Sequence, residues 1–232
     1  MERTRGDGRE SLSLCRAHPG APVGRCGRWT VVRRHVQLEG ARRPGYSALR
    51  HPVSSLVLGR RGYVQVANFS VAGGMYAAGA AGLPRVQGRI APARGVPILI
   101  GAAAAGLLGS AAFTTDPVGG YPSGAHSVQA ERSTAGALHD GAAIPIFVGL
   151  PAAAVAQSWR FLRDGRRGWV LYSGASAMSM LVGLGCATAG FEQSRGFVGY
   201  GGLFQRVSIV SGFAWLTALF VRELRSTVGP PA

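Results

Sequence analysis

The 232-residue sequence predicts an all-α fold, a polytopic transmembrane helix bundle. Two observations on composition support this prediction: 47% of the residues are hydrophobic, and the mean hydropathy is +0.17. The third observation is that apolar runs recur along the chain, each close to the roughly 20 residues that a helix needs to cross a hydrocarbon core. With 36 glycines, the chain is also too rich in glycine for an ordinary soluble domain.

Apolar runs of crossing length occur in five places, and none has a charged residue in its middle. They span residues 63–83, 96–113, 142–159, 169–189 and 204–221. The third run contains Pro145 and Pro151, each of which would cost a soluble helix about 3 kcal/mol. In a membrane bundle, neighbouring helices satisfy the carbonyl groups that proline frees. The runs therefore predict five membrane-spanning helices rather than a large soluble helical core.

Small residues recur at every fourth position in the first two runs, a pattern that lets helix backbones approach closely. They are Gly74, Ala78 and Gly82 in the first run and Gly101, Ala105 and Gly109 in the second. We expect both grooves to pack helices of this chain together. An interface with another membrane protein is the alternative.

The N-terminal 36 residues differ from the remainder of the chain. They are rich in arginine and show neither apolar periodicity nor the apolar core of a signal peptide. We interpret residues 1–36 as an atypical segment that is disordered or results from a frame or start artefact. Residues 37–225 form the predicted multi-pass membrane domain, and residues 226–232 form a short C-terminal tail.

The chain is strongly basic, with a net charge of +15, and every lysine-or-arginine position is arginine. The absence of lysine, together with the alanine and glycine content, indicates a bacterial genome of high GC content, such as those of actinobacteria. Clustered arginine is also typical of nucleic-acid binders. Here most arginines flank apolar runs, where membrane topology explains them. We therefore expect the lipid bilayer as partner and no nucleic acid; the oligomeric state stays open.

Alternate links between the apolar runs differ in charge. Links 84–95 and 160–168 each carry +3, whereas links 114–141 and 190–203 carry −2 and 0. Because arginine accumulates on the cytoplasmic side, we predict a multi-pass protein of the cytoplasmic membrane. Links 84–95 and 160–168 are then cytoplasmic, and links 114–141 and 190–203 are extracytoplasmic.

Four motifs in order resemble a known family. They are "RPGYSALRHPVSSLVLGRRGYVQVANFSVAGG", "FTTDP" with "GYP", "LHD" and "GLFQR". Between about residues 37 and 225 the chain resembles the bacterial and archaeal integral-membrane family called domain of unknown function 998. The resemblance implies six helices, the first of them before "RPGY", where this chain has the atypical segment. No activity is established for the family, so the resemblance implies a fold and a location but no mechanism.

Catalytic and cofactor motifs are not recognisable in the sequence. It has no nucleophile elbow, no paired-histidine metalloprotease helix, no Walker loop and no complete dinucleotide fingerprint. Cys15 and Cys26 lack the spacing of metal ligands, and Cys186 is a lone thiol in an apolar run. We expect no cofactor and no metal, and we interpret the chain as a non-enzyme more readily than as an enzyme.

Polar residues from several predicted helices gather at the extracytoplasmic level. They are Gln65, Asn68, Asp116, Tyr121, His139, Asp140, Gln205 and Arg206. Ionisable groups at membrane depth indicate function, so these eight residues form the candidate ligand-binding cluster. Each also has a plainer interpretation: Asp116 as the first residue of a turn, Asp140 as a helix N-cap, Tyr121 as an interfacial anchor and Arg206 as a snorkelling side chain. We expect Asp116 or Asp140 to pair with Arg206.

Three functions stay open at this point. The preferred one is the binding or handling of a small or lipidic ligand at an outward-facing polar pocket, by a transporter-like or sensor-like module. The second is an intramembrane enzyme that uses His139 with Asp116 or Asp140 for proton transfer. His139 as a metal ligand beside Asp116, Asp140 or His126 matches no recognised site. The third is a structural partner of another membrane protein.

Overall fold

The computed structural model describes residues 43–87, 95–125 and 131–227. They form a short 3-10 helix, η2 (Val53–Val57), and five α-helices. The α-helices are α2 (Gly62–Gln87), α3 (Gly95–Ala112), α4 (Thr134–Arg163), α5 (Arg167–Phe191) and α6 (Gly201–Thr227). The described residues contain no strand, and Val118 and Tyr121 form an isolated β-bridge. The predicted all-α bundle of five helices is confirmed.

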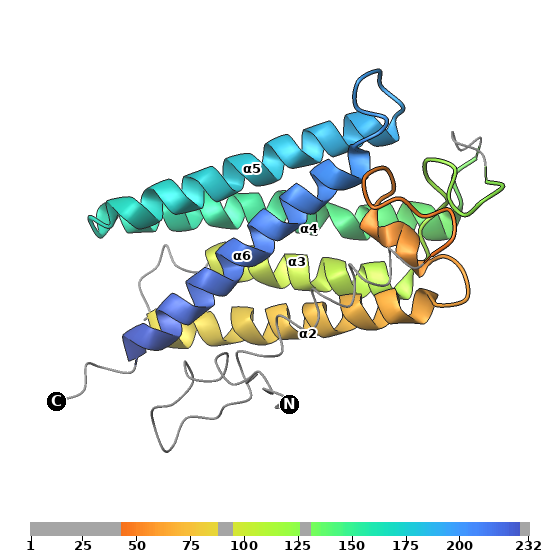
Figure 1. The fold of residues 1–232 in the computed structure, drawn as a ribbon. Helices are drawn as coiled ribbons and strands as arrows, with labels where there is room; N and C mark the ends of the chain where they lie inside the picture. The colour runs from red at the N-terminus through yellow and green to blue at the C-terminus, as the bar shows by residue number, and fades with distance from the viewer. Residues whose placement is uncertain (1–42, 88–94, 126–130, 228–232) are drawn as a thin grey trace, which may run out of the picture. The chain divides into compact units, whose positions relative to one another are not determined.

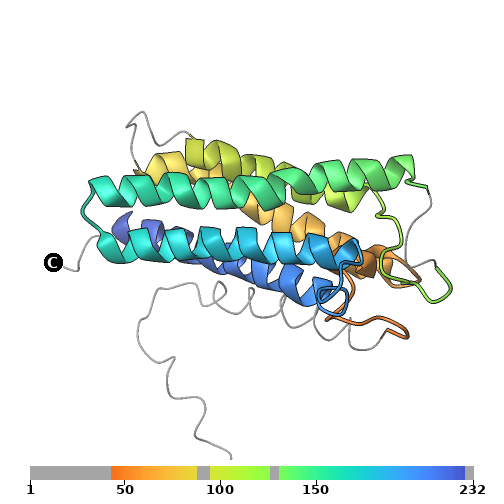
Figure 2. The same cartoon turned by 90° about the horizontal axis from the view of Figure 1, so that it is seen from above.

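Each of the five helices packs mainly against its neighbours in the chain. Helices α3 and α4 run side by side, and α5 contacts both α4 and α6 (Figure 2). Helix α6 crosses the others obliquely and also contacts α2 and α4 (Figure 1). At one end of the bundle α2, α4 and α6 begin and α3 and α5 end; we call it the turn end. The opposite end, with the α4–α5 link, is the arginine end.

Four helices are long and apolar enough to cross a membrane: α3, α4, α5 and α6. Helix α2 has 26 residues, which corresponds to roughly 39 Å at about 1.5 Å per residue. It is long enough to cross a membrane, but it is not apolar enough to count as a span by composition. Gln65, Asn68 and Ser70 lower its mean hydropathy near the turn end. Of the five predicted spans, four therefore agree with both length and composition.

The core of the bundle is formed by large side chains from different helices. Trp215 and Leu219 of α6, Tyr76 of α2, Phe161 of α4 and Ile100 of α3 are at most 1% exposed. Large apolar side chains also point away from the core, including Ile144 and Trp159 of α4 and Leu171 of α5. A helix that is apolar on all sides is typical of a membrane span.

Helix α4 begins earlier than the apolar run predicts, at Thr134 instead of residue 142. Its N-cap is Ser133, whose Oγ accepts a hydrogen bond from the backbone N–H of Gly136 at 3.0 Å. The interpretation of Asp140 as the N-cap is therefore wrong, because Asp140 lies inside α4. The apolar run marks only the part that suits hydrocarbon, whereas a capped helix continues into polar sequence.

The small-residue groove predicted on α2 does not pack against another described helix. A Cβ added at Gly74 or Gly82 would meet no atom within 4 Å, and Ala78 is exposed. The close approaches on α2 occur instead at Gly73, against Leu108 of α3, and at Gly79, against Phe220 of α6. On α3 the expectation holds in part, because a Cβ at Gly109 would lie 2.8 Å from the Cβ of Ala142.

Candidate functional site

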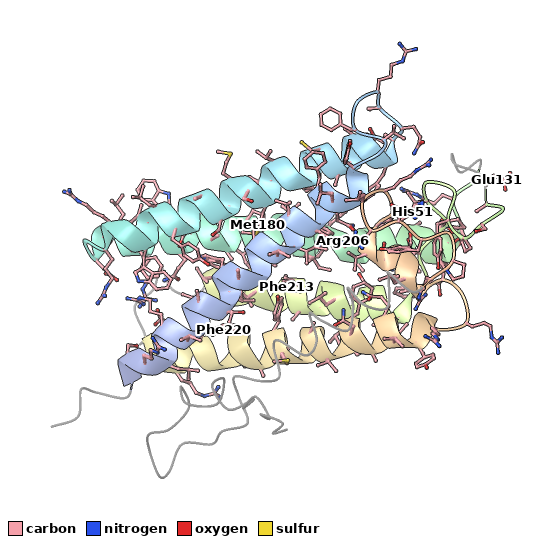
Figure 3. The ribbon with its side chains drawn as sticks, in the orientation of Figure 1. His51, Glu131, Met180, Arg206, Phe213 and Phe220 are labelled. Atoms are coloured by element: carbon pink, nitrogen blue, oxygen red, sulfur yellow. The ribbon has the colours of Figure 1, made fainter. Side chains whose placement is uncertain are left out.

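Arg206 lies in the second turn of α6 and binds the described segment that precedes α2, residues 43–61, which we call the entry segment (Figure 3). Its guanidinium donates hydrogen bonds to the carbonyl oxygens of Ala48 at 2.6 Å and His51 at 3.2 Å. It also donates to the carbonyl of Gly202 at 2.9 Å and to the phenol oxygen of Tyr46 at 2.5 Å. Five guanidinium donors in a planar fork suit several acceptors at once. Arg206 therefore fixes the entry segment to the start of α6.

The neighbouring residues of α6 reinforce this attachment. Gln205 is 9% exposed, and its Oε1 accepts a hydrogen bond from the backbone N–H of Val53 at 2.7 Å. At Gly202 an added Cβ would collide with the carbonyl oxygen of His51 and lie 2.7 Å from that of Ala48. Only glycine leaves room for the backbone of the entry segment at this position.

Three aromatic rings pack together beside Arg206. Tyr46 and His51 come from the entry segment, and Tyr121 comes from the turn between α3 and α4. Their centroids lie 5.2 to 5.6 Å apart in each pair. The guanidinium carbon of Arg206 lies 5.8 Å from the centre of the Tyr46 ring, a cation–π distance. Tyr121 is 5% exposed, so it is a packing residue of this group rather than an interfacial anchor.

His51 connects the entry segment to the turn between α3 and α4, and its hydrogen bonds fix which ring nitrogen carries the proton. Its Nδ1 accepts a hydrogen bond from the backbone N–H of Ser47 at 2.9 Å, so Nε2 carries the proton and donates to the carbonyl of Gly119 at 3.2 Å. Burial, which disfavours the charged ring, lowers the pKa of His51, and the charges of Arg50 and Arg206 act in the same direction. Burial raises the pKa of Tyr46, although the charge of Arg206 opposes this.

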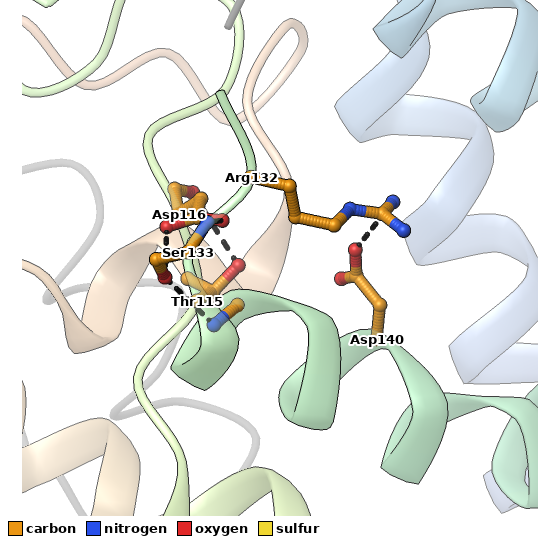
Figure 4. A network of polar contacts seen from close by, with 6 residues as sticks. Thr115, Asp116, Arg132, Ser133 and Asp140 are labelled. Carbon is orange, nitrogen blue, oxygen red and sulfur yellow. Dashed lines mark hydrogen bonds and ion pairs between the residues drawn. The ribbon is translucent and has the colours of Figure 1, made fainter.

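Asp116 connects the turn to the start of α4 (Figure 4). Its Oδ1 accepts a hydrogen bond from Ser133 Oγ at 2.6 Å, and its Oδ2 accepts one from the backbone N–H of Ser133 at 3.0 Å. A Cβ at Gly136 would collide with the same carboxylate. A carboxylate at a helix N-terminus is favourable because the unpaired N–H groups carry partial positive charge. Asp116 thus supports the cap of α4 in addition to its place in the turn.

His139 and Asp140 are adjacent in sequence but point to different surroundings. His139 is 3% exposed, and its Nδ1 lies 2.9 Å from the carbonyl oxygen of Phe113, which can only accept. Asp140 is exposed and pairs with Arg132 at 2.9 Å (Figure 4). Neither Asp116 nor Asp140 shares a hydrogen bond with His139 in the described ranges. In those ranges no three His, Cys, Asp or Glu residues are grouped to hold a metal ion.

The prediction that a carboxylate pairs with Arg206 is wrong. Within the described residues the hydrogen-bond partners of Arg206 are three backbone carbonyls and Tyr46, and Asp116 and Asp140 bind Ser133 and Arg132 instead. Backbone carbonyls accept from a guanidinium as a carboxylate does, and they need no second buried charge. The cost of desolvating a carboxylate is therefore avoided.

Buried polar atoms without a protein partner gather at the turn end. Besides Arg50 Nε of the entry segment, they include three atoms of uncharged side chains: Ser55 Oγ in η2, Gln65 Nε2 in the first turn of α2 and Ser110 Oγ in the last turn of α3. All three residues are at most 2% exposed. Because α2 and α3 are antiparallel neighbours, the start of α2 and the end of α3 lie at the same end (Figure 1). Asn68, one turn after Gln65, is half-buried.

The structure thus divides the eight predicted site residues into separate groups. Tyr121, Gln205 and Arg206 join the entry segment, whereas Asp116, His139 and Asp140 surround the start of α4. Gln65 and Asn68 lie on α2. Sequence reasoning missed Tyr46, His51, Ser55 and Ser110 as members of the turn end. The "RPGYSALRHP" motif contains the first two and was the available signal.

Comparison with known proteins places the chain in a family. The model of the family described as "Protein of unknown function (DUF998)" matches residues 34–222, which is most of the chain. No curated protein and no solved structure matches the chain.

Proposed function

We propose that this chain, which belongs to the DUF998 family of membrane proteins, binds the polar part of a small or lipidic ligand at the turn end of its helix bundle. The protein then acts as a transporter-like or sensor-like module. The observation that carries the proposal is the set of three buried polar atoms without a protein partner: Ser55 Oγ, Gln65 Nε2 and Ser110 Oγ.

Energetics support a bound partner for these atoms. A buried donor or acceptor that loses its hydrogen bond costs about 1–3 kcal/mol, so buried polar groups are nearly always satisfied. An amide N–H of Gln65 donates, whereas the hydroxyls of Ser55 and Ser110 both donate and accept. Such a set suits hydroxyl, carbonyl or phosphate oxygens of a ligand. None of these three side chains carries a charge, but Arg50, whose Nε is also buried without a protein partner at this end, does, so a zwitterionic polar group fits best.

The surroundings of these atoms also suit binding. The entry segment, which contains Ser55, is fixed by Arg206 and Gln205, and the turn is fixed to α4 by Asp116. Rigid supports lower the entropic cost of ordering a site when a ligand binds. With the four arginines of the entry segment included, the turn end carries +2, against +6 for the two links at the arginine end. This difference favours an extracytoplasmic site in the cytoplasmic membrane, because arginine accumulates on the cytoplasmic side.

The test compares compounds that copurify with the full chain and with Gln65→Leu. After purification in detergent, bound compounds are extracted and identified by mass spectrometry. We expect one polar or lipidic compound at a near-stoichiometric level in the unchanged protein and at least a tenfold lower level in Gln65→Leu, since one good hydrogen bond is worth about that factor.

Gln157→Leu is the matched control. Gln157 is also fully buried with an unpartnered amide, but it lies in α4 toward the arginine end. The control should keep the compound. If Gln65 only lacks a partner and binds nothing, both substitutions should leave the extracted compounds unchanged and raise the melting temperature, because each removes an unsatisfied buried amide. That result would contradict ligand binding at the turn end.

A further inference from the structure

A groove separates α4 from α5 on the surface near the arginine end. Its volume is about 180 Å³. It is lined by Val155, Ser158, Trp159, Leu162, Val170 and Gly174. Trp159 and Leu162 are 64% and 53% exposed, so they form an open wall rather than a closed cavity. The Oγ of Ser158 donates to the carbonyl of Val170 at 3.1 Å, which leaves the groove apolar.

Arginines continue both walls of the groove beyond its end. Arg163 lies one turn after Trp159 on α4, and Arg167 lies one turn before Val170 on α5. Each arginine is therefore on the same face of its helix as a residue that lines the groove. Arg166 joins them in the link. All three are exposed, and in the described part of the chain their guanidinium groups have no hydrogen bond or ion pair. An apolar groove therefore leads directly to unpaired positive charge.

We propose that this groove binds an anionic phospholipid, with an acyl chain between α4 and α5 and the phosphate on Arg163 and Arg167. Both helices are long and apolar enough to span a membrane, so the groove faces hydrocarbon while the link lies at the level of the headgroups. Guanidinium groups bind phosphate oxygens in pairs of parallel hydrogen bonds. Basic sites between helices at a membrane surface suit anionic headgroups.

A phospholipid fits these observations better than a second copy of the chain. Another copy would bring its own +3 link to the same level, and like charges repel. A lipid instead supplies the opposite charge next to an apolar chain. The exposed indole of Trp159 marks the same boundary, where tryptophan is typical of the interface between hydrocarbon and headgroups.

The test is native mass spectrometry of the full chain in detergent with phosphatidylglycerol or phosphatidylcholine of identical acyl chains. We expect phosphatidylglycerol to bind more tightly. Arg163→Gln with Arg167→Gln should weaken that binding about fivefold per arginine, down to the affinity for phosphatidylcholine. Arg60→Gln with Arg195→Gln is the charge-matched control, because both arginines are exposed at the opposite end of the bundle. It should leave the preference unchanged.

A second pair of variants tests the groove itself. A Cβ at Gly174 or Gly185 of α5 would meet no atom within 4 Å, so both positions accept a larger side chain, but only Gly174 lines the groove. Gly174→Leu should lower phosphatidylglycerol binding, and Gly185→Leu should not. Equal binding of the two lipids, or equal behaviour of the variants and their controls, would overturn the proposal. A change from dimer to monomer on Gly174→Leu would assign the groove to a second copy instead.

Discussion

His51 donates a hydrogen bond from Nε2 to the carbonyl oxygen of Gly119, 68 residues further along the chain. This contact connects the segment before α2 to the turn between α3 and α4, and a protonated ring would keep it, whereas the hydrogen bond that Nδ1 accepts from Ser47 needs the neutral ring. Protonation would place a second N–H on Nδ1, which faces the N–H of Ser47 at 2.9 Å. The hydrogen bond between Ser47 and His51 is therefore sensitive to pH.

We predict that stability at the turn end falls as the medium becomes acidic. The pKa of His51 is lowered in the folded protein from its ordinary value of 6.5. Below that value the unfolded chain binds more protons than the folded chain, so stability falls with decreasing pH. The contribution is fully present above about pH 6.5 and is lost as pH falls through the folded pKa. Melting temperatures in detergent between pH 8 and pH 5 measure it.

His51→Gln is the control for this prediction, because its amide keeps a donor and an acceptor but does not titrate. Its melting temperature should fall less between pH 8 and pH 5 than that of the unchanged protein. Parallel curves for the two proteins would show that His51 is not the group responsible.

The second prediction concerns the partners of Arg206. Arg206→Gln removes hydrogen bonds from a charged donor, each worth about 1.5–3 kcal/mol, so we expect a loss of at least about 2 kcal/mol in unfolding free energy. Tyr46→Phe in the same chain should couple with Arg206→Gln by about 1 kcal/mol, because the two side chains share a bond of 2.5 Å. Thermal and chemical unfolding in detergent would measure both.

Asp140→Asn is the control for the coupling between Arg206 and Tyr46. Asp140 pairs with Arg132 on the surface, so its coupling with Arg206→Gln should stay below about 0.5 kcal/mol. A coupling to Asp140 larger than that to Tyr46 would restore the carboxylate partner that the sequence suggested.

A third prediction concerns Asp116 and the start of α4. Asp116→Ala should cost about 1–2 kcal/mol, as the removal of a helix cap does. Gly136→Ala should also destabilise, since its Cβ would collide with the carboxylate of Asp116. The double variant should lose less than the sum of the two, because Asp116→Ala removes the colliding group. Strictly additive losses would show that Gly136 is not constrained by Asp116.

The fourth prediction concerns the sidedness of the bundle. In a chain whose own cysteines are replaced by serine, Ser123→Cys at the turn end should react with an impermeant thiol reagent in intact cells. Asp164→Cys in the α4–α5 link should be protected. Both residues are exposed, so differences in burial do not explain the contrast. The reverse pattern would invert the orientation that the arginine count predicts.

The helices were predictable from the sequence because hydrocarbon selects apolar runs of a fixed length, whatever packs against them. Their ends were less predictable: Ser133 caps α4, which begins at Thr134, eight residues before the apolar run, because capping, and not hydropathy, decides where a helix begins.

The hydrogen-bond partners of the site residues were harder to predict than the end of the bundle at which these residues lie. Asp116 and Arg206 both lie at the turn end as expected, but hydropathy does not specify which acceptor a guanidinium reaches. Tyr46 and His51 lie before the first apolar run and not at the end of a predicted helix, so hydropathy does not point to them. Most acceptors of Arg206 are backbone carbonyls, which every residue has, so the sequence does not indicate which of them bind it.

The attachment of the entry segment to α6 sets an order of events during biosynthesis. Val53 and Ala48 bind residues of α6 that are 152 and 158 positions later in the chain. A ribosome adds about 5–20 residues per second, so the entry segment waits roughly 8–30 s for Gln205 and Arg206. During that time α2, the one described α-helix that is not apolar enough to count as a membrane span, must keep its position without these hydrogen bonds. The turn end is therefore the last region of the protein to be completed, only after the final helix has left the ribosome.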